Sequence, residues 1–535
     1  MDPRFVGIWF EMPSFSDYKD FQPLPSFKFE KEPKMNPFSR RNFLRSTLYT
    51  SAAAGAVSPT FMFANDGPAA NDKIECAVLG IRSRGRAHIN AFLNDPRTVI
   101  TYLVDPDESF GQARCSEVEK KQGSRPKFIK DMRDAFADKD LDAVSSATPN
   151  FWHGLSAIWA MQAGKDVYVE KPASQNLFEG KSMIAAVKKY GRICQVGTQS
   201  RSLRAICEVM KFIHEGGIGN VDLARGLCYK RRKSIGALGD CTQNIPKSLD
   251  FDLWSGPAIL TEPKLTRPNL HYDWHWQRLY GNGDSGNQGA HELDIARWGL
   301  GLKRHPNKVV TYGGRLGYQA ERKDPNYVDA GDTPNTEVSV FDYGDKTIVF
   351  ETRGLETPDL DGTKIGVIFY GTEGKLVIFN FNNTRCIAYD KNGKVIREFR
   401  GGYLQDHFAN FLDAVAARDA SVLNAPILEG HISAAMAHLG NASYYLGEKN
   451  RVSVDTLCKE MEKIESRDDN KNTVLRTAEH LKANGVDLDA TPLSLGPQLK
   501  FDPEKEGFCD CCADANKLLD REWREGFVCP SVSEV

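Results

Sequence analysis

The chain has no excess of charge of either sign and only a sparse set of cysteines. Its 69 lysines and arginines nearly balance 71 aspartates and glutamates, which leaves a formal charge of −2 over 535 residues. Nucleic-acid-binding domains need a basic surface to neutralise phosphates, so no nucleic-acid partner is expected. Twelve cysteines scattered over this length are too few for a disulfide scaffold, and most are expected to be buried thiols.

The sequence also lacks the paired Cys-x-x-Cys spacing of a structural zinc site. Its one dense cysteine group is Cys509-Asp510-Cys511-Cys512, with Cys529 beyond it. No second pair or histidines match this group, so a disulfide or free thiols are favoured there and no metal site is predicted. There is no internal repeat and no long low-complexity segment. Length and a hydrophobic content of 41% fit a globular protein of about two domains.

The N-terminal region has the pattern of an export signal. Ser39-Arg40-Arg41-Asn42-Phe43-Leu44-Arg45 precedes a weakly apolar stretch, 46–64, and this order resembles a twin-arginine signal peptide. Residues 35–64 are therefore predicted to direct the folded protein, through the twin-arginine machinery, to the periplasm or otherwise out of the cytoplasm. The apolar stretch is short for a membrane span. Met35 is the favoured start, so 1–34 is expected to be a non-native or disordered extension. An incidental Arg-Arg pair is the alternative.

From Lys73 onward, apolar strand-like runs alternate with amphipathic stretches, a pattern that predicts a parallel sheet covered by helices. Strands are expected at 74–79, 99–104, 143–147, 167–169 and 193–196. Helices are expected at 85–93, 110–121, 153–163 and 177–189. The fold class is therefore α/β, with a Rossmann-type NAD(P)-binding domain over 73–200.

The first predicted strand runs into a damaged dinucleotide-binding fingerprint, Gly80-Ile81-Arg82-Ser83-Arg84-Gly85. Arg82 replaces the middle glycine of G-x-G-x-x-G, which normally lets a pyrophosphate approach the backbone. Either the phosphate is displaced or an arginine helps to hold it. We favour the second, because Arg82, Arg84 and Arg86 cluster at the expected helix N-terminus, a common anion site.

Asp105 ends the second predicted strand, in Leu103-Val104-Asp105. An acidic residue at this place accepts hydrogen bonds from the adenosine ribose hydroxyls, and its charge repels a 2′-phosphate. NAD is therefore favoured over NADP, although an arginine turned towards this corner would undo the preference.

Glu170-Lys171-Pro172 closes the apolar run 167–169. Proline fixes its own φ and restricts the lysine before it to extended geometry, so the ammonium of Lys171 can be directed at one point. Taken alone, the tripeptide is equally consistent with a charged end to a buried strand.

Four motifs in this order make the chain, over roughly 73–465, resemble the Gfo/Idh/MocA oxidoreductases. They are the glycine-rich turn, Thr148-Pro149-Asn150-Phe151-Trp152-His153, Glu170-Lys171-Pro172 and Gly289-Ala290-His291. The resemblance implies a tightly held nicotinamide and a cis Lys171–Pro172 bond. It also implies a C-terminal α/β domain, 201–465, whose largely antiparallel open sheet supports the substrate site and often an oligomer interface, so a homo-oligomer is expected. Its cofactor contacts map to Thr148, Pro149, Asn150, His153, Glu170 and Lys171, beside Gly80, Ile81, Arg82, Gly85 and Asp105.

The resemblance also places a catalytic histidine at His291, after a glycine-rich stretch and near an expected helix start. An imidazole can take a hydroxyl proton while hydride leaves the same carbon, and Lys171 would stabilise the developing alkoxide. A core histidine bonded to Asp294 is the alternative. Many members carry aspartate where this chain has Asn287. Asparagine orients a hydroxyl but cannot relay a proton.

Substrate contacts are expected from the aromatic segment 271–276 and from Arg201, Arg204 and Asp294. Trp276 is the favoured stacking surface for a sugar ring, although Trp274 and Trp276 could instead alternate on a strand and pack inward. Alternating runs at 337–341, 347–351 and 375–379 predict antiparallel strands of a half-buried sheet. Helices are expected at 407–417 and 430–445. Residues 466–535 are expected to form an arm, with a short helix at 514–523 that docks on another surface or subunit.

An exported nicotinamide enzyme finds no dependable pool of free NAD, so it must keep its cofactor and regenerate it in place. We therefore expect an exported NAD(P)-dependent oxidoreductase that transfers hydride between the nicotinamide and a carbohydrate or polyol. One alternative is a redox-neutral NAD-dependent enzyme that cleaves or isomerises a glycoside. The other is a non-catalytic dinucleotide-binding sensor, which the changes at Arg82 and Asn287 would suit.

Overall fold

The computed structural model describes residues 73–237, 245–259, 270–382, 385–509 and 512–535. The predicted extension at 1–34 and export signal at 35–64 lie outside these ranges, as does Cys511. The described residues belong to one compact unit, Ala70–Val535. Within them, no helix combines the length and the apolar character that a membrane crossing requires.

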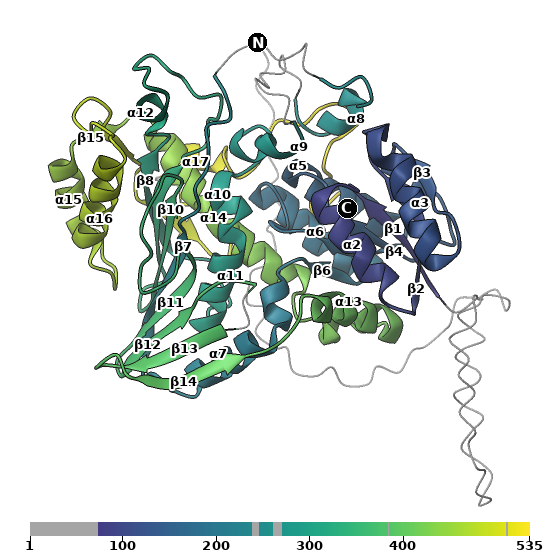
Figure 1. Cartoon of the computed structure of the whole chain (residues 1–535), viewed down its shortest axis with the longest axis horizontal. Coiled ribbons are helices and arrows are strands. Elements are labelled where there is room, and N and C mark those ends of the chain that lie inside the picture. The colour runs from purple at the N-terminus through teal and green to yellow at the C-terminus, as the bar shows by residue number, and fades with distance from the viewer. Residues whose placement is uncertain (1–72, 238–244, 260–269, 383–384, 510–511) are drawn as a thin grey trace, which may run out of the picture. The chain divides into compact units, whose positions relative to one another are not determined.

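The first sheet is the predicted Rossmann sheet (Figure 1). Its strands are all parallel, in the order β3-β2-β1-β4-β5-β6, which is the order of a dinucleotide-binding fold. The strands are β1 Ile74–Leu79, β2 Thr98–Val104, β3 Lys127–Ile129, β4 Ala143–Ser146, β5 Asp166–Val169 and β6 Cys194–Val196. The five predicted strands are confirmed. Sequence patterns missed β3 because it is short and only its last residue, Ile129, is buried, whereas all three residues of the equally short β6 are buried.

Helices cover both faces of this sheet. Successive side chains of a strand point to opposite faces, and in these strands the side chains on both faces are apolar. Cys76 and Val78 of β1 face one layer, and Ala77 and Leu79 face the other. The first layer contains α2 Ser83–Leu93, α3 Gly111–Gln122 and α13 Gln405–Ala417, and the second α4 Met132–Phe136, α5 Asn150–Gln162 and α6 Leu177–Tyr190. Thus α13, from the far end of the sequence, completes the Rossmann domain (Figure 1).

The second sheet confirms the prediction of a largely antiparallel C-terminal α/β domain. Its order is β14-β13-β12-β11-β7-β10-β9-β8-β16-β15, and among the described strands only β7 and β10 pair in parallel. The strands are β7 Val221–Cys228, β8 Lys308–Gly314, β9 Thr336–Asp342, β10 Thr347–Arg353, β11 Ile365–Gly371, β12 Gly374–Ile378, β13 Arg385–Asp390, β14 Val395–Arg400, β15 Arg451–Val452, β16 Leu493–Leu495, β17 Leu499–Asp502 and β18 Gly507–Phe508.

Helices pack on both faces of the centre of this sheet. On one face lie α7 Arg204–His214, α11 Gly289–Gly299 and α14 Ile427–Gly447. On the other lie α15 Val454–Glu462 and α16 Asn470–Ala483, whose Leu457 and Val474 contact Val340 and Val349 in one apolar cluster. As a result β9 and β10 are buried along their whole length. The prediction of a half-buried sheet is therefore wrong for these two strands.

The C-terminal segment packs on its own chain and is not a free arm. Strand β16 pairs with β8 and β15, and β17 pairs with β8 and β18. The terminal Val535 accepts hydrogen bonds from Lys189 Nζ (2.5 Å) and Tyr190 Oη (2.6 Å) on the Rossmann domain. The helix expected at 514–523 is limited to α17, Ala513–Asn516. Apolar and backbone partners within the chain explain why the segment docks there.

Candidate active site

The two outer glycines of the fingerprint are required by close backbone contacts. Gly80 has φ +76°, and a Cβ there would lie 2.7 Å from the oxygen of Ala147. A Cβ on Gly85 would lie 1.7 Å from the oxygen of Gly80. Helix α2 then begins at Ser83, and within the described chain no side chain caps its N-terminus. Its first backbone N–H groups are therefore available to a phosphate.

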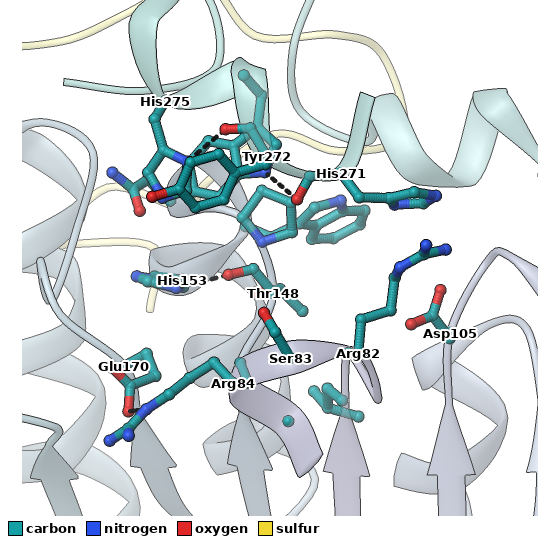
Figure 2. Close-up of a pocket in the computed structure, with 18 of the residues that line it drawn as sticks. Arg82, Ser83, Arg84, Asp105, Thr148, His153, Glu170, His271, Tyr272 and His275 are labelled. Carbon is teal, nitrogen blue, oxygen red and sulfur yellow. Dashed lines mark hydrogen bonds and ion pairs between the residues drawn. The ribbon is translucent and has the colours of Figure 1, made fainter. Parts of the chain in front are cut away.

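The three arginines at this turn do not form the shared anion cluster that the sequence predicted. Arg82 and Arg84 line the cavity, but their guanidinium groups turn to different carboxylates. Figure 2 shows the contact of Arg84 with Glu170. The pairs are Arg82 with Asp107 (2.8 Å), Arg84 with Glu170 (2.6 Å) and Arg86 with Glu117 (3.5 Å). Opposite charges nearby in the fold, which the local sequence does not reveal, neutralise them. The backbone at the start of α2 is the better phosphate site.

Asp105 lies at the carboxyl end of β2 and lines the cavity, where the ribose contact was predicted. Its two carboxylate oxygens accept hydrogen bonds from the backbone N–H of Ile81 and of Asp107, both at 3.0 Å. The Ile81 side chain itself is buried and contributes only its N–H to this corner. Burial raises the pKa of Asp105 to about 6, against the effect of these hydrogen bonds.

Thr148, Pro149, Asn150 and His153 lie at the junction of β4 and α5 and line the same cavity. The buried His153 ring contacts two carbonyl oxygens, that of Pro172 through Nδ1 (2.6 Å) and that of Thr148 through Nε2 (2.9 Å). Figure 2 shows the contact with Thr148. His153 therefore fixes the Thr148 segment against the Lys171–Pro172 peptide bond, which is cis as expected.

Glu170 is a buried carboxylate that lines the cavity next to Lys171. Besides Arg84, its Oε1 contacts Nε2 of the buried His88 at 3.0 Å. Although burial acts to raise it, these partners, Arg84 foremost, hold the pKa of Glu170 well below its usual range. A Cβ on Gly197 would lie 2.8 Å from Oε1, so the carboxylate has little room to turn. The geometry gives Glu170 a positioning role beside Lys171.

Lys171, Asn287 and His291 line one cavity, although they come from opposite halves of the chain. Lys171 Nζ donates to the backbone oxygen of Asn287 (2.7 Å) and to its Oδ1 (3.2 Å). Burial lowers the pKa of Lys171 to about 8. Asn287 ends α10, Gly283–Asn287, so the expected glycine-rich loop is in part helical.

His291 lies in the first turn of α11 and stacks on Phe381, with ring centroids 4.1 Å apart. Its Nδ1 is buried and has no hydrogen-bond partner among the described residues. Burial, and then the Lys171 charge, hold the pKa of His291 well below its usual range, so the imidazole is neutral. A neutral imidazole can accept a proton.

Arg201 and Asp294 do not contact the cavity, which contradicts their prediction as substrate residues. Both are buried and form an ion pair, with Arg201 Nε 2.8 Å from an oxygen of Asp294. Arg201 also pairs with Glu429 at 2.9 Å. Because Asp294 bonds Arg201, the alternative of a core histidine held by Asp294 is wrong as well.

The aromatic segment is helical, and this changes which of its residues reach the cavity. α9 (Leu270–Asp273) continues into a 3₁₀ turn, Trp274–Trp276. His271, Tyr272, Trp274 and His275 line the cavity, and Figure 2 shows three of them above the fingerprint turn. Trp276 instead packs with Ile235 and Ala330, so its prediction as the stacking surface is wrong, and so is the alternative of two tryptophans on a strand.

Several cavity residues escaped sequence analysis because they carry no local motif. Gln199 begins a 3₁₀ turn, Gln199–Ser202, Phe381 and Asn382 lie in a loop, and Gln288 occupies the one-residue break between α10 and α11. Behind it, Gln288 Nε2 donates to Oε1 of the fully buried Glu292 at 3.1 Å. Burial raises the pKa of Glu292 to about 8. In the sequence, only the four-residue spacing between Gln288 and Glu292, which is about one helical turn, could have suggested that these two side chains bond.

The cavity is about 350 Å³, within the range of small-ligand sites. Residues 74–198 match the family model described as "Oxidoreductase family, NAD-binding Rossmann fold", GFO_IDH_MocA. This part of the chain is therefore similar to the NAD-binding domain of the Gfo/Idh/MocA family. Two features of the turn fit a bound dinucleotide: the N-terminus of α2 has no side-chain cap, and Gly80 and Gly85 allow close backbone contacts beside it.

The chain is also similar to curated proteins over part of its length. The chain is 33% identical over 148 residues to scyllo-inositol 2-dehydrogenase (NAD(+)) of Bacillus subtilis, covering 28% of this chain and 42% of that protein. It is 28% identical over 260 residues to levoglucosan dehydrogenase of Pseudarthrobacter phenanthrenivorans (47% and 58%). It is 29% identical over 218 residues to a glycosyl hydrolase family 109 protein of Saccharopolyspora erythraea (36% and 46%). The chain thus spans about half the length of these relatives.

Solved structures extend the likeness to the second domain. Aldose-aldose oxidoreductase from Caulobacter crescentus, complexed with glycerol, aligns with a TM-score of 0.51 at 16% identity, covering 69% of this chain and 97% of that one. The WlbA dehydrogenase from Bordetella pertussis, in complex with NADH and UDP-GlcNAcA, aligns with a TM-score of 0.50 at 18% identity, covering 69% and 96%. At these identities the likeness establishes a shared fold.

Proposed function

We propose that the protein is an NAD-dependent oxidoreductase that transfers hydride between the nicotinamide and a secondary alcohol of a carbohydrate or polyol. One observation carries the proposal: Lys171, Asn287 and His291 line the same cavity as the dinucleotide fingerprint. The relatives named inositol and levoglucosan dehydrogenases support the substrate class.

The chain's own side chains have distinct roles in this reaction. Lys171, which is an ammonium below pH of about 8, binds the reacting hydroxyl oxygen and stabilises its developing negative charge. The neutral His291 accepts the hydroxyl proton, and Asn287 orients Lys171 through two contacts. When bound, nicotinamide supplies the hydride acceptor. The aromatic residues of the 271–275 segment line the cavity beside these groups and offer ring faces to a bound substrate.

The preference for NAD over NADP rests on Asp105, and it is part of the same proposal. Its carboxylate lies at the end of β2 and lines the cavity. Arg82, the arginine that could favour a 2′-phosphate, is paired with Asp107 instead. The charge at this corner therefore remains negative when Asp105 is ionised.

Export through a twin-arginine signal at 35–64 remains a proposal from the sequence. Export of this kind requires that the cofactor is bound before transport and is regenerated within the site. A homo-oligomer is likewise proposed from the family resemblance.

The test uses purified protein that begins after the predicted signal. Denaturation should release NAD, and a panel of sugars and polyols should change the nicotinamide absorbance of the folded protein. Bound dinucleotide with no spectral change across the panel would contradict the dehydrogenase and favour a sensor.

A redox-neutral glycoside-cleaving or isomerising enzyme is the second candidate, because one relative is named a glycosyl hydrolase family 109 protein. Transient oxidation of a ring hydroxyl would acidify the neighbouring C–H bond, and the same carbonyl would be reduced again after elimination and addition of water. Cleavage of aryl glycosides without net NADH formation would select this candidate over the first.

A further inference from the structure

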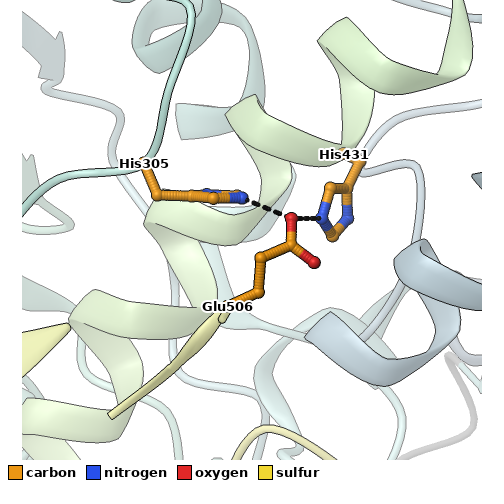
Figure 3. A group of neighbouring side chains, drawn as sticks. All are labelled: His305, His431 and Glu506. Carbon is orange, nitrogen blue, oxygen red and sulfur yellow. Dashed lines mark hydrogen bonds and ion pairs between the residues drawn. The ribbon is translucent and has the colours of Figure 1, made fainter. Parts of the chain in front are cut away.

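Three side chains that the proposed reaction does not use, and that do not line the cavity, meet beside α14. Nε2 of His305 lies 2.9 Å, and Nε2 of His431 3.0 Å, from the same oxygen, Oε1 of Glu506 (Figure 3). His305 and His431 are buried, and the Glu506 side chain is 10% exposed. The three ligand atoms lie within 4.8 Å of one another. We propose that they bind one transition-metal ion of the Zn²⁺ class.

The ligand types and distances suit such an ion. Zn²⁺ prefers imidazole nitrogen and carboxylate oxygen, with bonds of about 2.0–2.2 Å. Ligand atoms in a tetrahedral site are therefore about 3.3 Å apart. The two nitrogen–oxygen distances here are shorter by only a few tenths of an ångström, so a small rotation of the Glu506 side chain opens the site. A fourth position is left for water.

The surroundings confine the two rings, and they leave the tautomer of His305 free. A Cβ on Gly180 of α6 would lie 2.1 Å from Nδ1 of His431, so that ring is closely confined. The ring of His305 packs edge-on against Phe501, with centroids 5.6 Å apart. Nδ1 of His305 has no hydrogen-bond partner in the described part of the chain. When the proton of the neutral ring is on Nδ1, Nε2 presents its lone pair to a metal.

The nearby charges determine which carboxylate oxygen binds. Lys181 Nζ on α6 lies 3.7 Å from Oε2 of Glu506, so this oxygen has a cationic neighbour. Oε1, which faces the two imidazoles, is the metal-binding oxygen. Lys181 is one-quarter exposed and can turn towards solvent, which reduces its repulsion of a bound cation.

The site joins segments that are far apart in the sequence, which is why no spacing motif predicted it. His305 precedes β8, His431 lies in α14, and Glu506 lies in the turn between β17 and β18. The separations to Glu506 are 201 and 75 residues. A bound ion would clamp the C-terminal segment to the body of the protein, and it would do so without contact with the proposed catalytic residues.

The experiment uses the full mature chain after treatment with a chelator. Zn²⁺ should rebind at about one equivalent and raise the Tm, because an ion that binds only the folded state stabilises it. His431→Gln and Glu506→Gln should lose this equivalent, whereas His214→Gln, an exposed histidine, should keep it. Absence of stoichiometric Zn²⁺, or unchanged binding in both variants, would overturn the proposal in favour of a hydrogen-bonded cluster.

The neighbouring cysteines need a separate control, because thiolates also bind Zn²⁺. Replacement of Cys509, Cys511 and Cys512 by serine should leave the equivalent in place. Co²⁺ bound to the unchanged chain should give weak visible bands without the near-ultraviolet charge transfer of a thiolate. This spectrum decides the matter even if the histidine and glutamate variants do not fold. Thiolate charge transfer would assign the metal to the cysteines and overturn the site.

Discussion

Lys171 Nζ donates to both the backbone oxygen and Oδ1 of Asn287, at 2.7 and 3.2 Å. The contact joins the end of β5 in the Rossmann domain to the end of α10 in the second domain. It fixes the ammonium at the cavity that His291 also lines. Because an aspartate commonly occupies the position of Asn287 in the family that the sequence resembles, this neutral partner gives Lys171 less electrostatic support than a carboxylate would.

Replacement of Lys171 by alanine should lower kcat by about 100- to 1,000-fold, the effect of removing one donor to a developing oxyanion. Dinucleotide binding should persist, since the fingerprint turn and Asp105 are unchanged. Steady-state kinetics and the NAD content of the purified variant check this. Lys211→Ala, on the exposed face of α7, is the matched control. Activity retained in Lys171→Ala would remove our central catalytic assignment.

The pH profile should report the lowered pKa of Lys171, which is about 8 because the group is buried. Below this pH the ammonium is present, and above it the charge is lost. We therefore expect kcat/KM for alcohol oxidation to fall as the pH rises through about 8. Burial raises the pKa of Glu292 to about 8 as well, so Glu292→Gln separates the two groups. If the fall in kcat/KM disappears in Glu292→Gln, the titrating group is Glu292 and not Lys171.

Asn287→Asp should move this limb to higher pH. A carboxylate in hydrogen-bond contact with Lys171 favours the ammonium, and a nearby opposite charge commonly shifts a pKa by about one unit or more. The measurement is again the pH dependence of kcat/KM. Asn382→Asp adds a charge to the same cavity at a residue that bonds Gln199 instead of Lys171. An equal shift in both variants would show a general field effect and would contradict the specific contact.

The preference for NAD over NADP should weaken in acid. Burial raises the pKa of Asp105 to about 6, so its carboxylate is charged above that pH and protonated below it. Repulsion of a 2′-phosphate should decline accordingly, and the ratio of NADP to NAD dissociation constants should fall between about pH 7.5 and pH 5.5. Asp105→Asn should show a low ratio that does not change with pH. A ratio that is constant in the unchanged protein would exclude Asp105 as the discriminating charge.

Local patterns were enough to predict the Rossmann domain. Each of its longer strands is a run of apolar residues bounded by turns, and the helices between them have their own period, so the element order and the parallel sheet follow from neighbouring residues. The glycines at 80 and 85 could also be placed from the fingerprint spacing. The 1.7 Å contact of Gly85 is with Gly80 in the same motif, whereas the 2.7 Å contact of Gly80 is with Ala147, just after another strand, and was not visible in the sequence. The position of Asp105 follows from the end of its strand.

The partners of charged and aromatic side chains were decided by the tertiary structure alone. Arg84 and Glu170 are 86 residues apart, and Arg201 and Asp294 are 93 apart, so nothing local distinguishes a phosphate-binding or substrate-binding arginine from a paired one. Likewise, Trp276 lies outside the cavity because segment 271–276 is helical, whereas the alternation of aromatic and polar residues in this segment had also suited a strand. A sequence specifies such elements through short-range preferences, but charge neutralisation and burial depend on which distant residues the fold brings together.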